Sequence, residues 1–96
     1  MFHVYILRCA DHSFYVGHTR NITRRVDAHN AGLGAAFNSK RRPVRLVYSE
    51  PHDTRTAAVR RERQIKRWTR RKKEALIRAV FTLSLPKTTA VLISRA

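Results

Sequence analysis

Two short runs of β-branched and aromatic residues, separated by turn-forming residues, open this chain and limit the folds that it can adopt. The first run covers residues 3–8 (HVYILR), and the second covers residues 14–16 and ends at Gly17. The Asp-His-Ser segment at 11–13, which lies between the two runs, favours a turn. This arrangement is typical of a β-hairpin. The sequence therefore predicts a sheet that begins with two adjacent antiparallel strands.

Capping residues and side-chain periodicity predict further helices and a strand after the hairpin, and therefore an α+β domain. The expected order of elements is β-β-α-β-α, which favours a three-stranded antiparallel sheet flanked by helices. The elements expected after the hairpin are a helix over 22–30 capped by Asn21, a strand over 44–49 that Pro51 ends, a helix over about 55–68 capped by Thr54, and a further helical piece over 70–79.

The chain has room for one small domain. Its 96 residues suit a single hydrophobic core, and no internal repeat is visible. We assign the domain to residues 1–79 and treat residues 80–96 as a tail. The tail is apolar and β-branched with Pro86 inside it, which fits a short strand pair, a docked tail or a loosely ordered segment.

A large excess of positive charge accompanies this pattern. Lys and Arg number 21 against 6 Asp and Glu, which gives a formal net charge of +15, and the 43% of hydrophobic residues exclude a disordered basic tail. The single Cys9 excludes a disulfide framework and a Cys-based zinc site. No apolar run reaches the roughly 18 residues of a membrane span, and no secretory signal is visible. We expect a reduced, cytoplasmic domain with a polyanionic partner and no membrane partner.

The scarcity of acids limits the chemistry that the chain can perform. Many phosphodiesterases hold two metal ions with a dense cluster of carboxylates, and 6 acids spread over 96 residues form no tight motif of that kind. The 5 histidines show no HxH or HExxH spacing. A nuclease built on this sequence would work with few acids, such as one metal-binding carboxylate helped by Arg and Tyr.

Tyr5 and Tyr15 stand one in each arm of the expected hairpin. Tyrosines in strands are most often half-buried packing residues. In a functional site, a nearby basic cluster would lower the pKa of such a phenol from about 10 and favour the phenolate. Both interpretations fit the pattern.

Arg25 lies on the apolar side of the first expected helix. The residues that share this face are Ile22, Arg25, Val26 and His29. An arginine on a core-facing stripe is costly to bury without an anion, and because acids are scarce, a phosphate is a suitable partner. The alternatives are an arginine that extends to water from the edge of the stripe and, for His29, a packed core histidine.

Glu62 is the single acid in a strongly basic stretch. It shares a helix face with Ala58 and Ile65, which places its carboxylate on the apolar side. One interpretation is an ordinary surface ion pair with Lys66, four residues further on. The other is a carboxylate whose pKa is depressed by the surrounding bases and which holds a Mg²⁺ or Mn²⁺ ion that keeps several waters.

Most of the remaining positive charge falls in two basic runs. Nine Lys and Arg lie between residues 60 and 73, and three more precede Pro43. Such runs are most simply solvated faces that contact nucleic-acid phosphates. Trp68, within the larger run, fits a core residue better than a base-stacking platform. The expected phosphate-contacting residues are Lys40, Arg41, Arg42, Arg60, Arg61, Arg63, Lys66, Arg67, Arg70, Arg71, Lys72 and Lys73.

In this order the motifs resemble the signature of the GIY-YIG nuclease superfamily. VYI at residues 4–6 and YVG at 15–17 resemble its two halves, and a helix with Arg25 and a later helix with Glu62 follow as in that family. His3 stands where the first motif has its Gly. The pattern over residues 2–79 is similar to the small stand-alone YhbQ-like branch, with YILR at 5–8, NITRR at 21–25, LVYSE at 46–50, AVRRE at 58–62 and RRKKE at 70–74.

The resemblance implies roles for five residues. GIY-YIG nucleases use one divalent metal ion, and the glutamate that holds it matches Glu62. Tyr5 and Tyr15 match the paired tyrosines, one of which orients or deprotonates the attacking water. Arg25 matches the arginine that neutralises charge on the scissile phosphate, and His29 matches a position often taken by a helper His or Tyr.

The resemblance also implies a function. We expect a metal-dependent endonuclease that hydrolyses phosphodiester bonds in DNA during repair or processing. Larger relatives carry separate DNA-reading domains, so this chain should show low sequence specificity, prefer a DNA structure, or rely on a protein partner for its target. Two alternatives stay open: a non-catalytic basic module that binds DNA or RNA, and an RNA-associated protein. The sequence predicts no oligomeric state.

Overall fold

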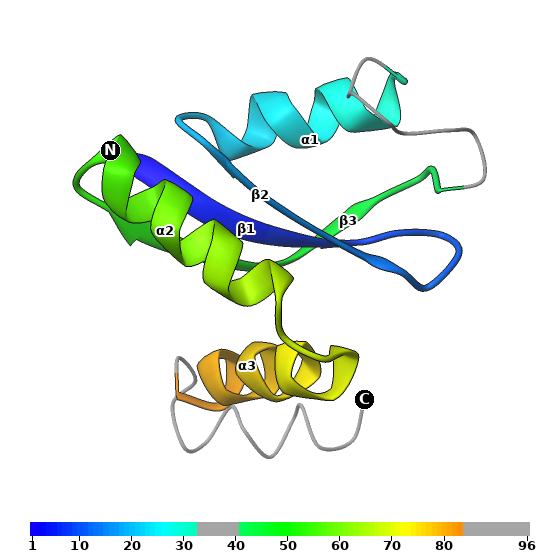
Figure 1. The fold of residues 1–96 in the computed structure, drawn as a ribbon. Coiled ribbons are helices and arrows are strands. Elements are labelled where there is room, and N and C mark those ends of the chain that lie inside the picture. Colours follow the sequence, from blue (N-terminus) through cyan, green and yellow to red (C-terminus); the bar gives the residue numbers. More distant parts are fainter. Residues whose placement is uncertain (33–40, 84–96) are drawn as a thin grey trace.

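Three strands and three helices form the part of the chain that the structure, a computed structural model, describes, namely residues 1–32 and 41–83 (Figure 1). Lys40 and residues 84–96 of the predicted tail lie outside these ranges. No helix within them is long and apolar enough to cross a membrane. The elements are β1 (Phe2–Arg8), β2 (Phe14–Thr19), α1 (Ile22–Asn30), β3 (Arg45–His52), α2 (Arg55–Lys66) and α3 (Arg70–Leu83).

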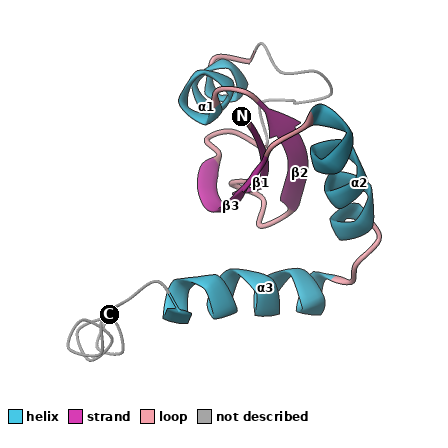
Figure 2. Ribbon diagram, turned by 90° about the vertical axis from the view of Figure 1, so that its left-hand side faces the viewer, coloured by secondary structure: helices cyan, strands magenta, loops and turns pink. Residues whose placement is uncertain are grey.

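The strands form one antiparallel sheet in the order β2-β1-β3, so the first strand of the hairpin occupies the centre. Residues 4–7 of β1 are all buried. Helix α1 lies on one side of the sheet and α3 on the other (Figures 1 and 2). The predicted α+β class, with a three-stranded antiparallel sheet flanked by helices, is confirmed.

Alternate residues of β1 face two separate cores, as successive side chains of a strand must. Val4 and Ile6 belong to the core that α2 and α3 cover. Tyr5 and Leu7 belong to the core on the other face, where α1 contributes Val26. This alternation sends the Tyr5 side chain to the α1 face of the sheet.

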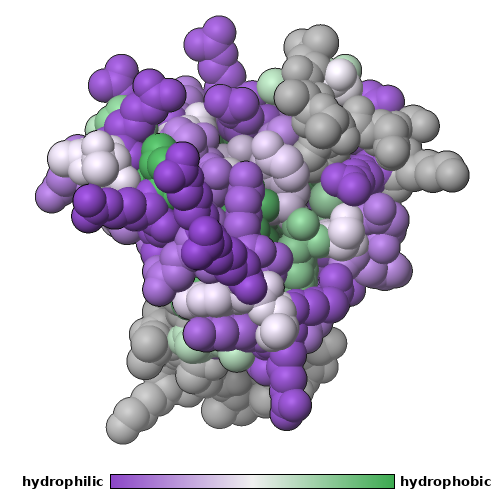
Figure 3. Space-filling model, viewed as in Figure 1, coloured by the Kyte–Doolittle hydropathy of each residue, from purple (hydrophilic) through white to green (hydrophobic). Residues whose placement is uncertain are grey.

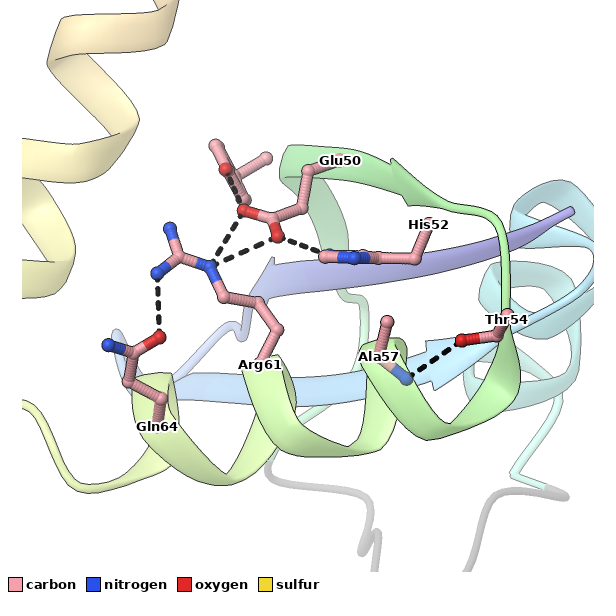
Figure 4. Close-up of polar contacts among 7 residues, drawn as sticks. Glu50, His52, Thr54, Ala57, Arg61 and Gln64 are labelled. Atoms are coloured by element: carbon pink, nitrogen blue, oxygen red, sulfur yellow. Dashed lines mark hydrogen bonds and ion pairs between the residues drawn. The ribbon is translucent and has the colours of Figure 1, made fainter.

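Asn21 and Thr54 cap α1 and α2 as predicted. The side chain of Asn21 accepts a hydrogen bond from the backbone N–H of Arg24 at 3.0 Å, and that of Thr54 accepts one from the N–H of Ala57 at 3.1 Å (Figure 4). Each satisfies a backbone donor that the first turn of a helix leaves without an intrahelical partner. The two caps fix where the helices that carry the site begin.

Several boundaries differ from the sequence prediction. β2 continues through Gly17 to Thr19, and β3 continues through Pro51 to His52. Proline is tolerated there because β3 is an edge strand, where a ladder hydrogen bond can be missing. Helix α2 ends at Lys66, before the predicted residue 68, and α3 extends to Leu83 instead of residue 79.

Candidate active site

Tyr5 and Gly17 lie opposite each other in the central and edge strands β1 and β2. Tyr5 is only 1% exposed. A Cβ atom on Gly17 would lie 2.6 Å from the Tyr5 hydroxyl oxygen and 2.8 Å from its Cζ, distances that real Cβ contacts essentially never show. The glycine therefore lets the buried phenol lie across β2, so that its hydroxyl reaches the edge strand.

Tyr15 and His29 pack around this phenol on the α1 side. The ring centre of Tyr15 lies 6.3 Å from that of Tyr5 and 4.9 Å from that of His29, which it meets edge-on. The Tyr5 hydroxyl oxygen is 3.5 Å from Nε2 of His29, a residue that is itself 1% exposed. The hairpin and α1 thus bring together three of the five expected catalytic residues.

Burial governs the protonation of Tyr5 and His29. Desolvation raises the pKa of Tyr5, Tyr15 raises it further, and the positive charge of Arg25 offsets only part of this. Desolvation, followed by the charge of Arg25, lowers the pKa of His29. Of the two interpretations that the sequence left open for Tyr5, burial therefore favours the packed, protonated phenol over the phenolate, because the loss of hydration outweighs the nearby positive charge. At neutral pH Tyr5 is a protonated hydrogen-bond donor and His29 is an uncharged base.

Arg25 lies at the rim of this group. The sequence left open whether it points into the core or extends to water, and the structure shows it exposed while His29 of the same helix face is buried. A long side chain at the edge of an apolar stripe can extend in this way. Its charge still affects the pKa values of both Tyr5 and His29. The guanidinium is therefore close to the buried pair and accessible to an anion.

Glu62 approaches the same region from α2, which covers the opposite face of the sheet. The buried residues Ala58 and Ile65 flank it along the helix, as the spacing predicted. Its side chain is 14% exposed. Its negative charge raises the pKa of Tyr5, so the carboxylate and the phenol share one electrostatic environment although α2 covers one face of the sheet and the Tyr5 side chain points to the other.

His18 and Lys66 hold the Glu62 carboxylate, one at each oxygen. Nδ1 of His18 donates a hydrogen bond to one oxygen at 2.6 Å, and the Lys66 ammonium lies 3.0 Å from the other. Burial alone would raise the pKa of Glu62, but the hydrogen bonds from His18 and Lys66 and their charges outweigh it, and the pKa is lowered. Glu62 is therefore ionised at neutral pH.

His18 was not selected from the sequence as a site residue. The alternation of side chains along β2 could have identified it. Gly17 lies against the Tyr5 hydroxyl on the α1 face of the sheet, and successive residues of a strand point to opposite faces, so His18 faces α2. A polar side chain at that point meets the acid of α2. The extension of β2 beyond Gly17, which the sequence did not predict, places His18 within the strand.

The comparison with protein families gives this geometry its context. The model of the protein family described as "GIY-YIG catalytic domain" matches residues 1–75. This range includes all five expected catalytic residues. The chain belongs to the GIY-YIG family. The resemblance seen in the sequence is confirmed, and membership implies a catalytic domain of the nuclease type.

Relatives of similar size share most of this GIY-YIG chain. A UPF0213 protein of Haloquadratum walsbyi is 51% identical over 74 residues, which span 77% of this chain and 83% of the relative. A UPF0213 protein of Staphylococcus aureus is 47% identical over 75 residues, which span 78% of this chain and 92% of the relative. The name UPF0213 states no activity.

Two solved structures are similar in fold. The solution NMR structure of a UPF0213 protein from Bacillus halodurans has a TM-score of 0.54 and 40% identity, and covers 82% of this chain and 85% of its own. The NMR structure of a protein from E. faecalis has a TM-score of 0.58 and 38% identity, and covers 88% of each chain. Both support the α+β fold of the GIY-YIG domain.

GIY-YIG nucleases generally depend on a divalent metal ion, and the surroundings of Glu62 suit one. Glu62 supplies one ionised carboxylate. Among residues 1–32 and 41–83, no group of three or more His, Cys, Asp or Glu could hold a metal ion. Mg²⁺ keeps several waters and often binds one or two carboxylates together with substrate phosphates. The donor set therefore fits a hydrated ion that a phosphate would share, and not one enclosed by protein ligands.

The expected phosphate-contacting residues of α2 and α3 differ in their surroundings. Hydrophilic side chains cover most of the face shown in Figure 3, and Arg60, Arg63 and Arg67 are exposed. Others are engaged with protein groups: Lys72 lies 4.3 Å from the centre of the Trp68 ring. Arg61 lies 5.1 Å from the same centre. The freely exposed members are the better suited to contact a backbone phosphate.

A second polar cluster joins α2 to β3. Glu50 accepts two hydrogen bonds from Nε of Arg61, at 3.1 and 3.0 Å, and one from Nε2 of His52 at 2.5 Å (Figure 4). The Tyr48 hydroxyl also donates to Glu50, and Arg61 donates to Gln64 at 2.8 Å. Arg61, expected to contact phosphate, thus ties α2 to the sheet one residue before Glu62.

Proposed function

We propose that this GIY-YIG protein is a metal-dependent endonuclease that hydrolyses phosphodiester bonds in DNA. The observation that carries the proposal is the ionised Glu62 carboxylate beside β2, where the Tyr5 hydroxyl also lies. Arg25 provides an accessible cation close by. In a chain of net charge +15, an anionic group and a guanidinium that both act on the same phenol form an arrangement that a divalent ion and a phosphate can share.

Each residue has a defined task in this proposal. The Arg25 guanidinium binds the scissile phosphate and neutralises the charge that develops on it. His29 takes a proton from the attacking water, and the protonated Tyr5 hydroxyl donates a hydrogen bond that orients this water. The water oxygen bonds to phosphorus as the bond to the 3′ oxygen breaks. A divalent ion, Mg²⁺ or Mn²⁺, held by Glu62 with His18 beside it, would supply positive charge to the leaving 3′ oxygen.

Tyr15 has a supporting part. Its ring meets the His29 ring edge-on at 4.9 Å between centres, a geometry that is favourable for aromatic pairs. The contact restrains the orientation of the His29 imidazole next to Tyr5. The two tyrosines are therefore not equivalent: Tyr5 presents its hydroxyl to the reaction, and Tyr15 keeps the base in place.

The target of the proposed nuclease is defined by DNA structure or by a protein partner more than by base sequence. The basic residues of α2 and α3 suit backbone phosphates, which carry no sequence information. We propose a role in DNA repair or processing on this basis. RNA is the competing substrate, and the same contacts would serve it.

Cleavage assays test the proposal. Single-stranded, duplex, flap and junction DNA, with RNA alongside, are incubated with the protein and Mg²⁺ or Mn²⁺. We expect metal-dependent cutting that Arg25→Ala abolishes, while Glu74→Gln retains it, because Glu74 pairs with Arg70 away from the site. Cutting that persists in Arg25→Ala at the wild-type rate would show that another group, or a contaminant, cleaves the DNA.

A non-catalytic nucleic-acid-binding module is the second candidate. It is favoured by the engagement of both Glu62 oxygens, one with His18 and one with Lys66, which would be a complete ion-pair network without any metal. This candidate predicts salt-dependent binding of DNA or RNA, no cleavage with either metal, and unchanged affinity in a Glu62→Gln variant.

A further inference from the structure

The turn of the hairpin and the start of β3 lie at the same end of the sheet (Figure 1), and two arginines are paired across the strands there. Arg8, the last residue of β1, lies in register with Arg45, the first residue of β3. Both side chains are exposed. Like charges directly opposite each other in a sheet lower its stability, so this pair opposes folding unless an anion binds it.

No carboxylate within the described ranges forms an ion pair with either arginine. Arg8 instead has Nη2 at 3.3 Å from Nδ1 of His12, and because a guanidinium can only donate, the imidazole nitrogen accepts. Asp11, close in the sequence, accepts hydrogen bonds from Ser13 at 3.0 and 2.6 Å and lies 3.9 Å from Arg41. The nearest acid of the turn is therefore already engaged.

A hollow of about 570 Å³ lies beside the pair. The residues that line it include Arg8, His12 and Arg45, together with the buried, apolar Val44. This volume is within the range of ligand pockets, roughly 300–1,000 Å³. Two arginines and no acid are among the residues that line this hollow, so it is suited to an anionic group that is part of a larger molecule.

We propose that Arg8 and Arg45 bind a backbone phosphate of the nucleic acid, outside the catalytic group of Tyr5, Arg25, His29 and Glu62. The inference rests on the proposed function only in that the ligand is a nucleic acid. A paired guanidinium site recognises the phosphodiester group by charge and hydrogen bonds. The bound phosphate removes the repulsion that the arginines exert on each other in the free protein.

Salt-dependent binding tests the site without requiring cleavage. Arg8→Gln/Arg45→Gln is compared with Arg24→Gln/Arg55→Gln, which removes the same charge from two exposed arginines elsewhere. Affinity for a fluorescent DNA duplex is measured without divalent metal over a range of salt concentrations. We expect the slope of log K against log salt to fall by about 0.9 in the first variant, for one phosphate contact, and by clearly less in the control. Equal losses in both, or no loss in the first, overturn the proposal.

Two further measurements test whether the double variant still folds and which class of ligand binds the arginine pair. The melting temperature of Arg8→Gln/Arg45→Gln should equal or exceed that of the wild type, because repulsion is removed. Side-chain Nε signals of Arg8 and Arg45 in NMR spectra should shift on titration with the duplex, and inorganic phosphate should shift them only at much higher concentration. Tighter binding of an acidic peptide than of DNA at these signals would overturn the choice of ligand. Shifts with DNA in a protein that never cleaves would uphold this site and reject the nuclease proposal.

Discussion

The contact between Gly17 and Tyr5 is the tightest constraint on a single residue of the site. In Gly17→Ala the added Cβ would meet the Tyr5 hydroxyl at 2.6 Å, so the buried phenol must move. We expect a loss of about 1–3 kcal/mol in the free energy of unfolding, typical of overpacking, and a loss of cleavage. Urea unfolding and a cleavage assay measure both.

A matched pair of variants isolates the cause. Tyr5→Phe removes the atom nearest to the added methyl group, so Tyr5→Phe/Gly17→Ala should lose less stability than the sum of the two single variants. Residues in contact show this non-additivity. Strict additivity of the two changes would contradict the steric explanation.

Lys66 competes with a metal ion for Glu62. Its ammonium lies 3.0 Å from a Glu62 oxygen and would repel a divalent cation there. We expect Lys66→Met to bind Mn²⁺ several-fold more tightly than the wild type in calorimetric titrations. Arg63→Met, which removes an exposed cation from the same helix, is the control. Similar tightening in both variants would indicate a general charge effect and no specific competition at Glu62.

At the scale of elements, the Glu50 cluster fixes α2 against β3. Glu50→Gln removes the charge that Arg61, His52 and Tyr48 share and leaves partly buried donors poorly satisfied. We expect a loss of about 1.5–3 kcal/mol in the free energy of unfolding, since hydrogen bonds to charged groups are worth about that much.

The exposed pair of Glu74 and Arg70 provides the comparison for this prediction. Surface ion pairs contribute only about 0–1 kcal/mol, so Glu74→Gln should change the urea midpoint little. If both variants lost the same stability, the cluster between α2 and β3 would have no special part in holding the helix.

The sequence predicted best those elements whose ends depend on contacts between residues close together in the chain. Asn21 and Thr54 cap their helices through contacts three residues away, so the sequence alone suffices. The path of β3 through Pro51 depends on its place at the sheet edge, which only the assembled sheet defines. The burial of Tyr5 likewise depends on β1 being central, and for this reason its raised pKa was not foreseen.

The family resemblance anticipated five site residues, Tyr5, Tyr15, Arg25, His29 and Glu62. In the structure the other four lie in contact with Tyr5 or within range of its charge interactions. His18 was missed because its contact with Glu62 joins residues 44 positions apart. The Arg8–Arg45 pair was missed for the same reason, since register between β1 and β3 creates it. Non-local pairings of this kind require the tertiary structure.

For the whole molecule, the depressed pKa values of the two partly buried carboxyls, Glu50 and Glu62, predict an acid limit to stability. Glu50 and Glu62 both have folded-state pKa values below their ordinary 4.5. Their contribution is therefore fully present above about pH 4.5 and is lost as pH falls through the lower folded-state values. We expect the melting temperature to fall as the pH passes below this window, in addition to the decline below about pH 6.5 that the lowered pKa of buried His29 produces.

A variant of both carboxyls tests this assignment. Glu50→Gln/Glu62→Gln should melt lower at neutral pH and show a shallower decline on acidification, because the groups that titrate are gone. If the melting temperature of this variant fell as steeply with decreasing pH as that of the wild type, the other acids of the chain would be responsible for the loss of stability.

The central claim is that Glu62 holds the metal ion required for DNA cleavage, and a single-turnover rate tests it most directly. Glu62→Gln is compared with the wild type at saturating protein on the DNA structure that the wild type cuts best, in Mn²⁺. We predict a rate lower by about 10²–10³-fold, as for loss of a main electrostatic contributor to a transition state, with DNA affinity in the absence of metal unchanged or tighter. A wild-type cleavage rate in Glu62→Gln would contradict the claim.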